Sequence, residues 1–361
     1  MGKFKFILQP HFFCHKENKV IETKNLNVVL FKYTSGICGV RLVNNEGYAE
    51  ILPFKGQQIW TAHFDGRDLQ MKSVFDEPSE STELLRNFGR FMFHCGALRV
   101  GAPTSTELHP LHGELPNAPF QEAWIESGED SKGCYISLSG RYVYKEFFGS
   151  QYAAEPEVRL YENSSVLNMS MKIKNLSNKP MEMMYLCHIN FLPVDNSTIR
   201  YSAKLTPENV KIRASIPSHL KPDPAYVRLI EDLKSKPELH HSITKELKAD
   251  PELVFYINYQ ADASGKCYTL QVHPDGKSDY VCHKKEQLPK VVRWISRTPD
   301  HDAVAIAETG TCEVEGYTVE KEKGNIKILK PGEEYYCNIE AGGLNVSQTN
   351  EILSKIIEIT K

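Results

Sequence analysis

The sequence lacks the local signatures of several large enzyme classes. It contains no Gly-x-Ser-x-Gly nucleophile elbow, no Gly-x-x-x-x-Gly-Lys phosphate-binding loop and no Gly-x-Gly-x-x-Gly dinucleotide fingerprint. It also contains no run of about 18 apolar residues, so we expect no membrane-spanning segment. The net charge of −3 over 361 residues provides no basic surface for nucleic acid. An ordinary globular composition remains, with 41% hydrophobic and 25% charged residues.

The nine cysteines form no recognisable metal-binding or redox pattern. Their number is odd, and no two of them are spaced as Cys-x-x-Cys. We therefore expect reduced thiols and no disulfide framework, as is typical of cytoplasmic proteins. Residues 1–10 lack the apolar core of a secretory signal peptide, which agrees with a cytoplasmic location.

Alternation of apolar and polar residues is the commonest local pattern in the chain. Residues 167–174, 253–259 and 268–272 alternate with a period of two, which is typical of strands with one buried and one wet face. Turn-forming residues separate such segments, as in Pro274-Asp-Gly276. Because strands predominate from one end of the chain to the other, we predict an all-β fold, a large antiparallel sandwich that forms a single domain over residues 1–361.

Two segments depart from this pattern. Residues 223–250 indicate a helical insertion of one or two short helices between strands, with Asp223 as the N-cap and Pro224 at the first helical position. Residues 348–359 indicate another helix near the C-terminus.

Three segments that are far apart in the chain carry side chains suited to proton transfer. In order, they are His109-Pro-Leu-His112-Gly-Glu114-Leu-Pro-Asn117-Ala-Pro119, Tyr185-Leu-Cys-His188-Ile-Asn190-Phe191 and Ile306-Ala-Glu308-Thr309. They supply imidazoles and a carboxylate, the groups that general acid–base chemistry near neutral pH requires. Their order along the chain, more than any single segment, points to one site.

Each of these residues also has a purely structural interpretation. His112 lies in a loop bounded by glycine and proline, where its ring could bond to the backbone. His188 lies among apolar residues, where a core histidine with satisfied hydrogen bonds is the alternative, and Glu308 could be a strand end that reaches water. The His109-x-x-His112 pair suggests a metal, but no further ligand stands at a usual zinc spacing, so we expect no metal site.

Taken together, the segments resemble the galactose mutarotase-like superfamily, and most closely its bacterial branch related to aldose 1-epimerases. The resemblance extends from about residue 55 to residue 345. Its motifs are Phe91–Pro103 (similar to GGL…TCGL…G-x-P), His109–Pro119 (similar to LHGR-x-S-N-x-PA), Tyr185–Phe191 (similar to LYH-x-N-x-G), Ala307–Thr309 (similar to EP-x-T), and Lys330–Tyr336 followed by Gly342–Leu344 (similar to L-x-PGE…G).

The resemblance implies a β-supersandwich fold and the roles of a mutarotase site. His188 would be the general acid that protonates the ring oxygen of a cyclic aldose, and Glu308 would be the general base that takes the proton of the C1 hydroxyl. His112 would hold the sugar in place. We expect a gap between His188 and Glu308 that is wide enough for a pyranose ring, and no cofactor. Weaker candidates for contacts to sugar hydroxyls, each with an equally plausible structural role, are His63, Arg90, Arg159, Asn190 and Trp294.

The chain departs from the branch's pattern at three places. Glu114 stands where arginine is usual, Leu192 stands where glycine is usual, and Gly310 follows Thr309 where the family has Glu-Pro. The change at Glu114 bears on which sugar is accepted. The acid–base residues His112, His188 and Glu308 are retained.

The leading functional hypothesis is an aldose 1-epimerase-like isomerase that acts on a free or modified sugar. The alternative is a carbohydrate-binding or sugar-sensing protein on the same scaffold without turnover, because a fold does not fix a function. A lyase or metal-dependent sugar isomerase is a third and weaker hypothesis. The expected partner is a small-molecule sugar, with no nucleic acid and no membrane, and a homodimer is compatible with the sequence.

Overall fold

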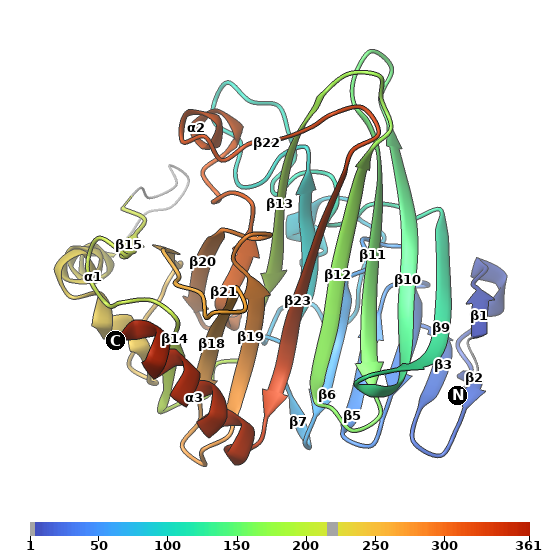
Figure 1. The fold of residues 1–361 in the computed structure, drawn as a ribbon, viewed down its shortest axis with the longest axis horizontal. Helices are drawn as coiled ribbons and strands as arrows, with labels where there is room; N and C mark the ends of the chain where they lie inside the picture. The colour runs from blue at the N-terminus through green and yellow to red at the C-terminus, as the bar shows by residue number, and fades with distance from the viewer. Residues whose placement is uncertain (1–3, 215–222) are drawn as a thin grey trace.

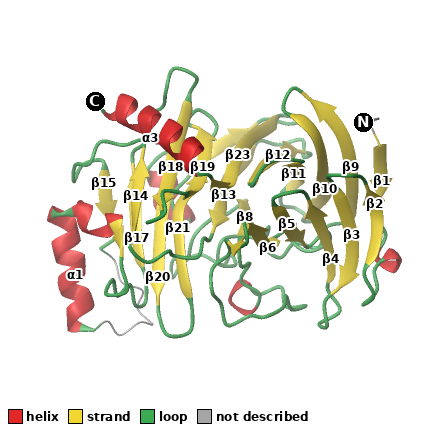
Figure 2. Ribbon diagram, turned by 90° about the horizontal axis from the view of Figure 1, so that it is seen from below, coloured by secondary structure: helices red, strands yellow, loops and turns green. Residues whose placement is uncertain are grey.

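Two large antiparallel sheets make up most of the protein (Figure 1). The structure is a computed structural model that describes residues 4–214 and 223–361; the first three residues of the N-terminal segment and residues 215–222 of the chain lie outside that description. Seen from below, the sheets form two layers, with the N-terminus and the C-terminus toward opposite ends of the molecule (Figure 2).

The first sheet has ten strands, and all of its pairings are antiparallel. In spatial order it consists of β1 (Phe4–Ile7), β9 (Glu122–Asp130), β10 (Gly133–Lys145), β11 (Gln151–Tyr161), β12 (Val166–Asn175), β23 (Glu334–Leu344), β19 (Ser278–Lys284), β18 (Lys266–Val272), β14 (Ser197–Tyr201) and β16 (Ser242–Ile243).

The second sheet has thirteen strands, two of which lie off its main path. In spatial order the main path is β15 (Val210–Ile212), β17 (Leu253–Ile257), β20 (Lys290–Arg297), β21 (Asp302–Gly310), β13 (Met181–Ile189), β8 (Met92–Ala97), β6 (Ile59–Phe64), β5 (Gly47–Ile51), β4 (Cys38–Val43), β3 (Asn27–Lys32) and β2 (Asn18–Glu22), while β22 (Lys327–Leu329) pairs with β13 and β7 (Arg67–Asp68) pairs with β6.

The main hydrophobic core contains side chains from both sheets, as a sandwich requires. Leu138 and Met171 come from the first sheet, and Ile51, Ile189 and Val304 come from the second; all are buried in one cluster. The predicted alternation is present: along β12 every second residue is buried. The predicted all-β antiparallel sandwich is therefore confirmed, while the extent of a single domain over residues 1–361 stays a prediction.

Helices lie at the periphery of the sandwich. Within the predicted insertion 223–250, the structure has α1 (Pro224–Ser235) and a 3₁₀ helix (Pro237–His241), and Asp223 caps α1 by accepting a hydrogen bond from the amide of Ala225 at 2.6 Å. The C-terminal helix α3 (Val346–Thr360) packs against the ten-stranded sheet through Ile352 and Ile356. The remaining helical segments, α2 (Tyr317–Glu322) and the 3₁₀ turns Pro10–Phe12 and Leu84–Arg86, were not predicted by the sequence pattern.

All nine cysteines are free thiols, as their spacing predicts. Among the described residues, no helix combines the length and apolarity needed to cross a bilayer.

Candidate active site

His188 and Glu308 come together because their strands are neighbours in the thirteen-stranded sheet. Cys187 of β13 pairs with Thr309 of β21, so the next residue of β13 and the preceding residue of β21 stand side by side. His188 Nε2 lies 3.1 Å from Glu308 Oε1, and their side chains are only 5% and 2% exposed. One interpretation of the sequence was that Glu308 is a strand end that reaches water. The burial of its side chain contradicts that interpretation.

Aromatic rings enclose the His188 imidazole. It stacks on Phe93 with ring centroids 4.5 Å apart, and it meets Phe88 and Trp294 edge-on at 5.5 and 5.6 Å. Its Nδ1 atom is buried and has no hydrogen-bond partner among the described residues. The ring is consequently held by packing, and its buried Nδ1 atom makes no hydrogen bond of normal geometry within the described part of the chain, which differs from a core histidine with all its hydrogen bonds satisfied.

His112 reaches the same place from the loop that follows β8. Its ring centroid is 5.5 Å from that of His188 at an interplanar angle of 87°, and its Nδ1 atom is also buried without a partner. The backbone of His112 has φ 59°, a left-handed conformation that is uncommon outside glycine and is often found at functional sites. Its amide donates to the carbonyl of Gly101 at 2.9 Å, and its carbonyl accepts from the amide of Gly96 at 3.0 Å, which fix this conformation.

Burial makes the charged forms of these groups unfavourable. It lowers the pKa of His188 well below 6.5, with His112 as a second cause, and it raises the pKa of Glu308 well above 4.5, with Glu252 as a second cause. The pKa of His112 is lowered to about 4, again mainly by burial. The site in the absence of ligand therefore favours neutral imidazoles and a protonated Glu308.

These side chains line one cavity of about 410 Å³, which is within the usual range for small-molecule sites. Much of the lining is apolar. The full lining consists of Leu85, Phe88, Ala102, Leu111, His112, His188, Arg213, Pro251, Glu252, Val254, Val292, Trp294, Ser296, His301, Glu308 and Val314.

Several polar side chains of the cavity are already paired. Glu252 accepts hydrogen bonds from Arg213 and from Trp294 Nε1, the latter at 2.7 Å. Ser296 Oγ lies 2.7 Å from His301 Nε2 and donates to the carbonyl of Pro251 at 2.7 Å. Sequence patterns gave no signal for Arg213 or Glu252, because neither lies in a recognisable motif.

The structure contradicts one expectation about the pair. We predicted a gap of pyranose width between His188 and Glu308, but the two side chains lie 3.1 Å apart. Because adjacent strands set this spacing, the sugar cannot lie between the two groups in this conformation. A ligand would have to approach both of them from the cavity side.

Of the weaker candidates, the structure brings Trp294 to the cavity and leaves Asn190 beside it in the core. Trp294 lines the cavity, whereas Asn190 is fully buried and donates to the carbonyl of Gly89 at 3.0 Å. Asn190 is therefore part of the support for this end of the sheet; its Oδ1 atom is buried without a partner among the residues that the structure describes, and its side chain opposes the lowering of the pKa of His188 that burial causes.

The other three candidates lie outside the lining of this cavity, so the structure does not bring them to His188, and their contact with a sugar stays a prediction. His63 of β6 pairs with Asp68 at 2.7 Å. Arg159 belongs to the other sheet and pairs with Asp130 at 2.9 Å. Arg90 lies close enough to Tyr33 for its positive charge to oppose the rise in the pKa of Tyr33 that burial causes. Sequence alone could not reveal these positions, because they depend on which strands become neighbours.

Glu114 also lies outside the lining of the His188 cavity. Its Oε1 accepts hydrogen bonds from the amides of residues 97–98, at 2.8 and 3.0 Å, and from Tyr152 OH at 2.6 Å. It lines another cavity together with His109, so His109 and His112 line different cavities. Burial raises the pKa of Glu114 from 4.5 to about 7.

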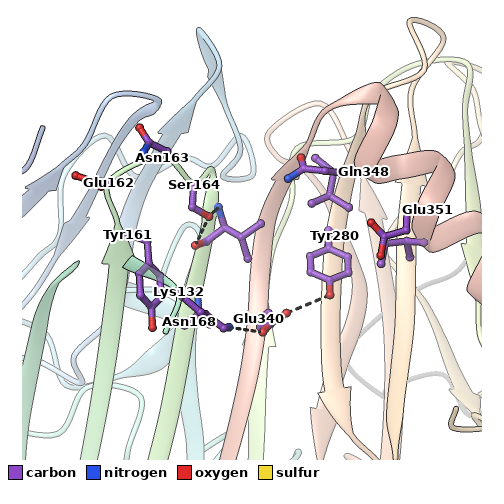
Figure 3. A pocket seen from close by; sticks show the side chains of 13 residues that line it. Lys132, Tyr161, Glu162, Asn163, Ser164, Asn168, Tyr280, Glu340, Gln348 and Glu351 are labelled. Carbon is purple, nitrogen blue, oxygen red and sulfur yellow. Dashed lines mark hydrogen bonds and ion pairs between the residues drawn. The ribbon is translucent and has the colours of Figure 1, made fainter. Parts of the chain in front are cut away.

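Another cavity, of about 330 Å³, involves β12, β23 and α3 (Figure 3). Lys132 Nζ donates to Asn168 at 2.8 Å and to Glu340 at 3.0 Å, and Tyr280 OH donates to Glu340 at 3.2 Å. These side chains satisfy one another, and the cavity is lined by neither histidine nor cysteine. It is therefore less suited to proton transfer than the His188 cavity.

The comparisons with known proteins agree with the fold. A family model described as "Domain of unknown function (DUF4432)" matches residues 38–342. No curated protein matches the sequence. A structure described as a "putative aldose 1-epimerase", from Klebsiella pneumoniae subsp. pneumoniae, is 17% identical, with a TM-score of 0.84 over 100% of this chain and 96% of that protein. A galactose mutarotase-like protein from Clostridium acetobutylicum is 12% identical, with a TM-score of 0.60 over 90% of this chain and 100% of that one.

Proposed function

Because the chain belongs to the DUF4432 family and has the galactose mutarotase-like fold, we propose that it is an aldose 1-epimerase-like isomerase. It would interconvert the anomers of a free or modified sugar by opening and reclosing the ring. The observation that carries this proposal is the contact at 3.1 Å between the buried side chains of His188 and Glu308, which line one cavity.

Ring opening needs two proton transfers, one at each of the two oxygen atoms bonded to C1. One group takes the proton of the C1 hydroxyl while another gives a proton to the ring oxygen; the bond between C1 and the ring oxygen breaks and leaves an open-chain aldehyde. Rotation about C1–C2 and reclosure, with both proton transfers reversed, deliver the other anomer. Since both oxygens are bonded to C1, the adjacent side chains of His188 and Glu308 can serve both from one edge of the sugar.

The number of protons on the pair matters more than which partner holds them. A protonated Glu308 beside a neutral His188 carries the same number of protons as a carboxylate beside an imidazolium. The resemblance implies the second arrangement, with His188 as the acid. Burial favours the first arrangement before a ligand enters, in which Glu308 would protonate the ring oxygen and His188 would take the hydroxyl proton.

The cavity walls suit a sugar ring. Phe88 and Trp294 offer apolar faces to carbon-bound hydrogens, and the His112 side chain lines the same cavity as a polar group. This proton chemistry needs no cofactor.

The experiment is an exchange-NMR screen of free aldoses, which measures binding and anomer exchange together. The proposal expects at least one aldose whose anomers exchange faster with protein than in buffer alone. His188→Asn and Glu308→Gln should abolish most of that acceleration while binding persists.

A non-catalytic carbohydrate-binding protein is the second candidate, and the same contact favours it. If the His188–Glu308 pair served only to hold the strands, it would stay closed in the presence of a sugar. That function expects aldoses that bind with no acceleration of exchange at any pH, and this result would replace the isomerase proposal.

A further inference from the structure

Arg293 is a completely buried cation on the strand beside Glu308. Its neighbours Val292 and Trp294 line the cavity, so the alternation along β20 turns Arg293 to the opposite face of the sheet. Among residues 4–214 and 223–361, none of the ion pairs includes Arg293. Burial of a charge without a carboxylate partner raises the free energy of the folded state. The remaining contacts of Arg293 must therefore offset this cost.

The first of these contacts is at a bulge in β21. Val292 pairs with Glu308 and Trp294 pairs with Ala305, so two residues of β21 oppose Arg293 alone. Arg293 Nε donates to the carbonyl of Ile306, one of those two residues, at 3.0 Å.

This bulge decides where Glu308 points. In a regular strand, residues three positions apart lie on opposite faces. The extra residue restores Glu308 to the same face as Ala305, which is the face that carries the cavity. Without the bulge, the carboxylate would lie on the core face, away from His188.

The second contact of Arg293 reaches the helical insertion. Arg293 Nη1 lies 2.6 Å from Nε2 of His240, which belongs to the 3₁₀ helix Pro237–His241. Because a guanidinium only donates, His240 Nε2 is the acceptor and its Nδ1 donates to the carbonyl of Pro237. The guanidinium also lies 4.3 Å from the ring of Tyr201 and donates to Tyr259 OH at 3.3 Å.

We propose that Arg293 is a positioning residue that holds the Ile306 bulge, and thereby Glu308 beside His188, and that His240 couples this bulge to the helical insertion. The part of this inference that concerns turnover rests on the proposed isomerase function. The part that concerns geometry does not.

Other titratable groups also surround the His188–Glu308 pair and Arg293. At the pair they are Cys95, His112, Cys187, Arg213, Glu252 and His301; at Arg293 they are Tyr201, His240, His241 and Tyr259. Variants at Arg293 leave all of them in place, so a change in the titration of the pair reports a change in its geometry or in the charge of Arg293.

The test uses two substitutions at one position and one at its partner. Arg293→Met removes the charge and the donor to Ile306, Arg293→Lys keeps the charge without the planar fork, and His240→Phe removes the acceptor. The control is Arg297→Met: Arg297 lies on the same strand and also donates to the insertion, at the carbonyl of Thr244, but it does not contact the bulge.

The first readout needs no activity. The ring ¹⁵N shifts of His188 are followed from about pH 5 to about pH 9 in the ligand-free protein, where they report its tautomer and the protonation of Glu308. We expect Arg293→Met and Arg293→Lys to alter these shifts, His240→Phe to alter them less, and Arg297→Met to match the wild type even if its thermal midpoint falls. Comparison of Arg293→Met with Arg293→Lys separates the loss of the positive charge from the loss of the planar guanidinium group.

The second readout is anomer exchange. Arg293→Lys should lower the maximal rate by roughly 10- to 100-fold, because small displacements of a catalytic group are costly, and should leave sugar affinity near the wild-type value. Wild-type ¹⁵N shifts in both Arg293→Lys and His240→Phe would overturn the inference, even if Arg293→Met does not fold. Altered shifts without exchange in any protein, wild type included, would uphold the positioning role and reject the isomerase function.

Discussion

His188 Nε2 and Glu308 Oε1 lie 3.1 Å apart on neighbouring antiparallel strands, with both side chains removed from water. Two ionisable groups this close do not titrate independently, because the proton of one changes the field at the other. The two groups therefore titrate as one unit, and the proposed catalysis depends on both of them together.

The first prediction concerns mutation of that unit. His188→Asn and Glu308→Gln should each lower anomer exchange by about 10²–10⁴-fold, since each removes one of two proton transfers. The double variant should be little worse than the more damaging single variant, because either change disables the same unit. Rates from exchange NMR test this. His63→Asn is the matched control and should retain the wild-type rate, because His63 lies outside the cavity lining.

The second prediction is the shape of the pH profile. The active pair carries one transferable proton. As pH falls, the pair gains a second proton at an imidazole whose pKa is lowered by burial; as pH rises, it loses its proton from a carboxyl whose pKa is raised by burial. The rate should therefore form a bell with a broad top. A rate that keeps rising with pH beyond the range of the pair would contradict transfer by these two groups.

The third prediction concerns Glu114 and stability. Its pKa is about 7 in the folded protein and 4.5 ordinarily, so the folded state binds this proton more tightly than the unfolded state. The contribution is fully present below pH 4.5 and is lost as pH rises to about 7, which lowers the free energy of unfolding by up to about 3 kcal/mol. Denaturant unfolding of wild type and Glu114→Gln across this range tests it: the variant should lack this component, because the amide keeps an acceptor oxygen but does not titrate.

The fourth prediction separates binding from chemistry at Trp294. Trp294→Ala should weaken sugar binding by about tenfold, since an aromatic contact contributes about 0.5–1.5 kcal/mol. Trp294→Phe keeps an aromatic face and loses only the hydrogen bond to Glu252, so its affinity should fall less. Titration of a bound aldose by NMR gives both values. Equal losses in the two variants would argue that the hydrogen bond, and not the ring face, supports the ligand.

The fifth prediction tests the capping of α3. The side chain of Asn345 accepts from the amide of Gln348 at 3.0 Å, and the side chain of Gln348 accepts from the amide of Asn345 at 3.0 Å. Asn345→Ala should lower the free energy of unfolding by about 1 kcal/mol. Asn350→Ala, at an exposed position within the same helix, serves as the control and should not destabilise the protein.

Local patterns in the sequence were enough to predict the class of fold. Alternation predicted strands such as β12, where Leu167 and Met169 face the core, because the two faces of a strand differ in their access to water. Asp223 and Pro224 likewise marked the start of α1, since capping depends on a few consecutive residues. The predicted acid–base residues His112, His188 and Glu308 do line one cavity, and the order of their motifs is what linked them.

By itself, then, the sequence determined the strands, the helical insertion and the candidate proton-transfer groups, because each depends on neighbouring residues or on a recognisable motif. Only the tertiary structure decided that β13 lies beside β21, which puts His188 in contact with Glu308 and removes the expected gap. It also separated His63 and Arg159 from the cavity. Strand order and a bulge of one residue are set by packing between segments far apart in the chain, and no local pattern specifies such contacts.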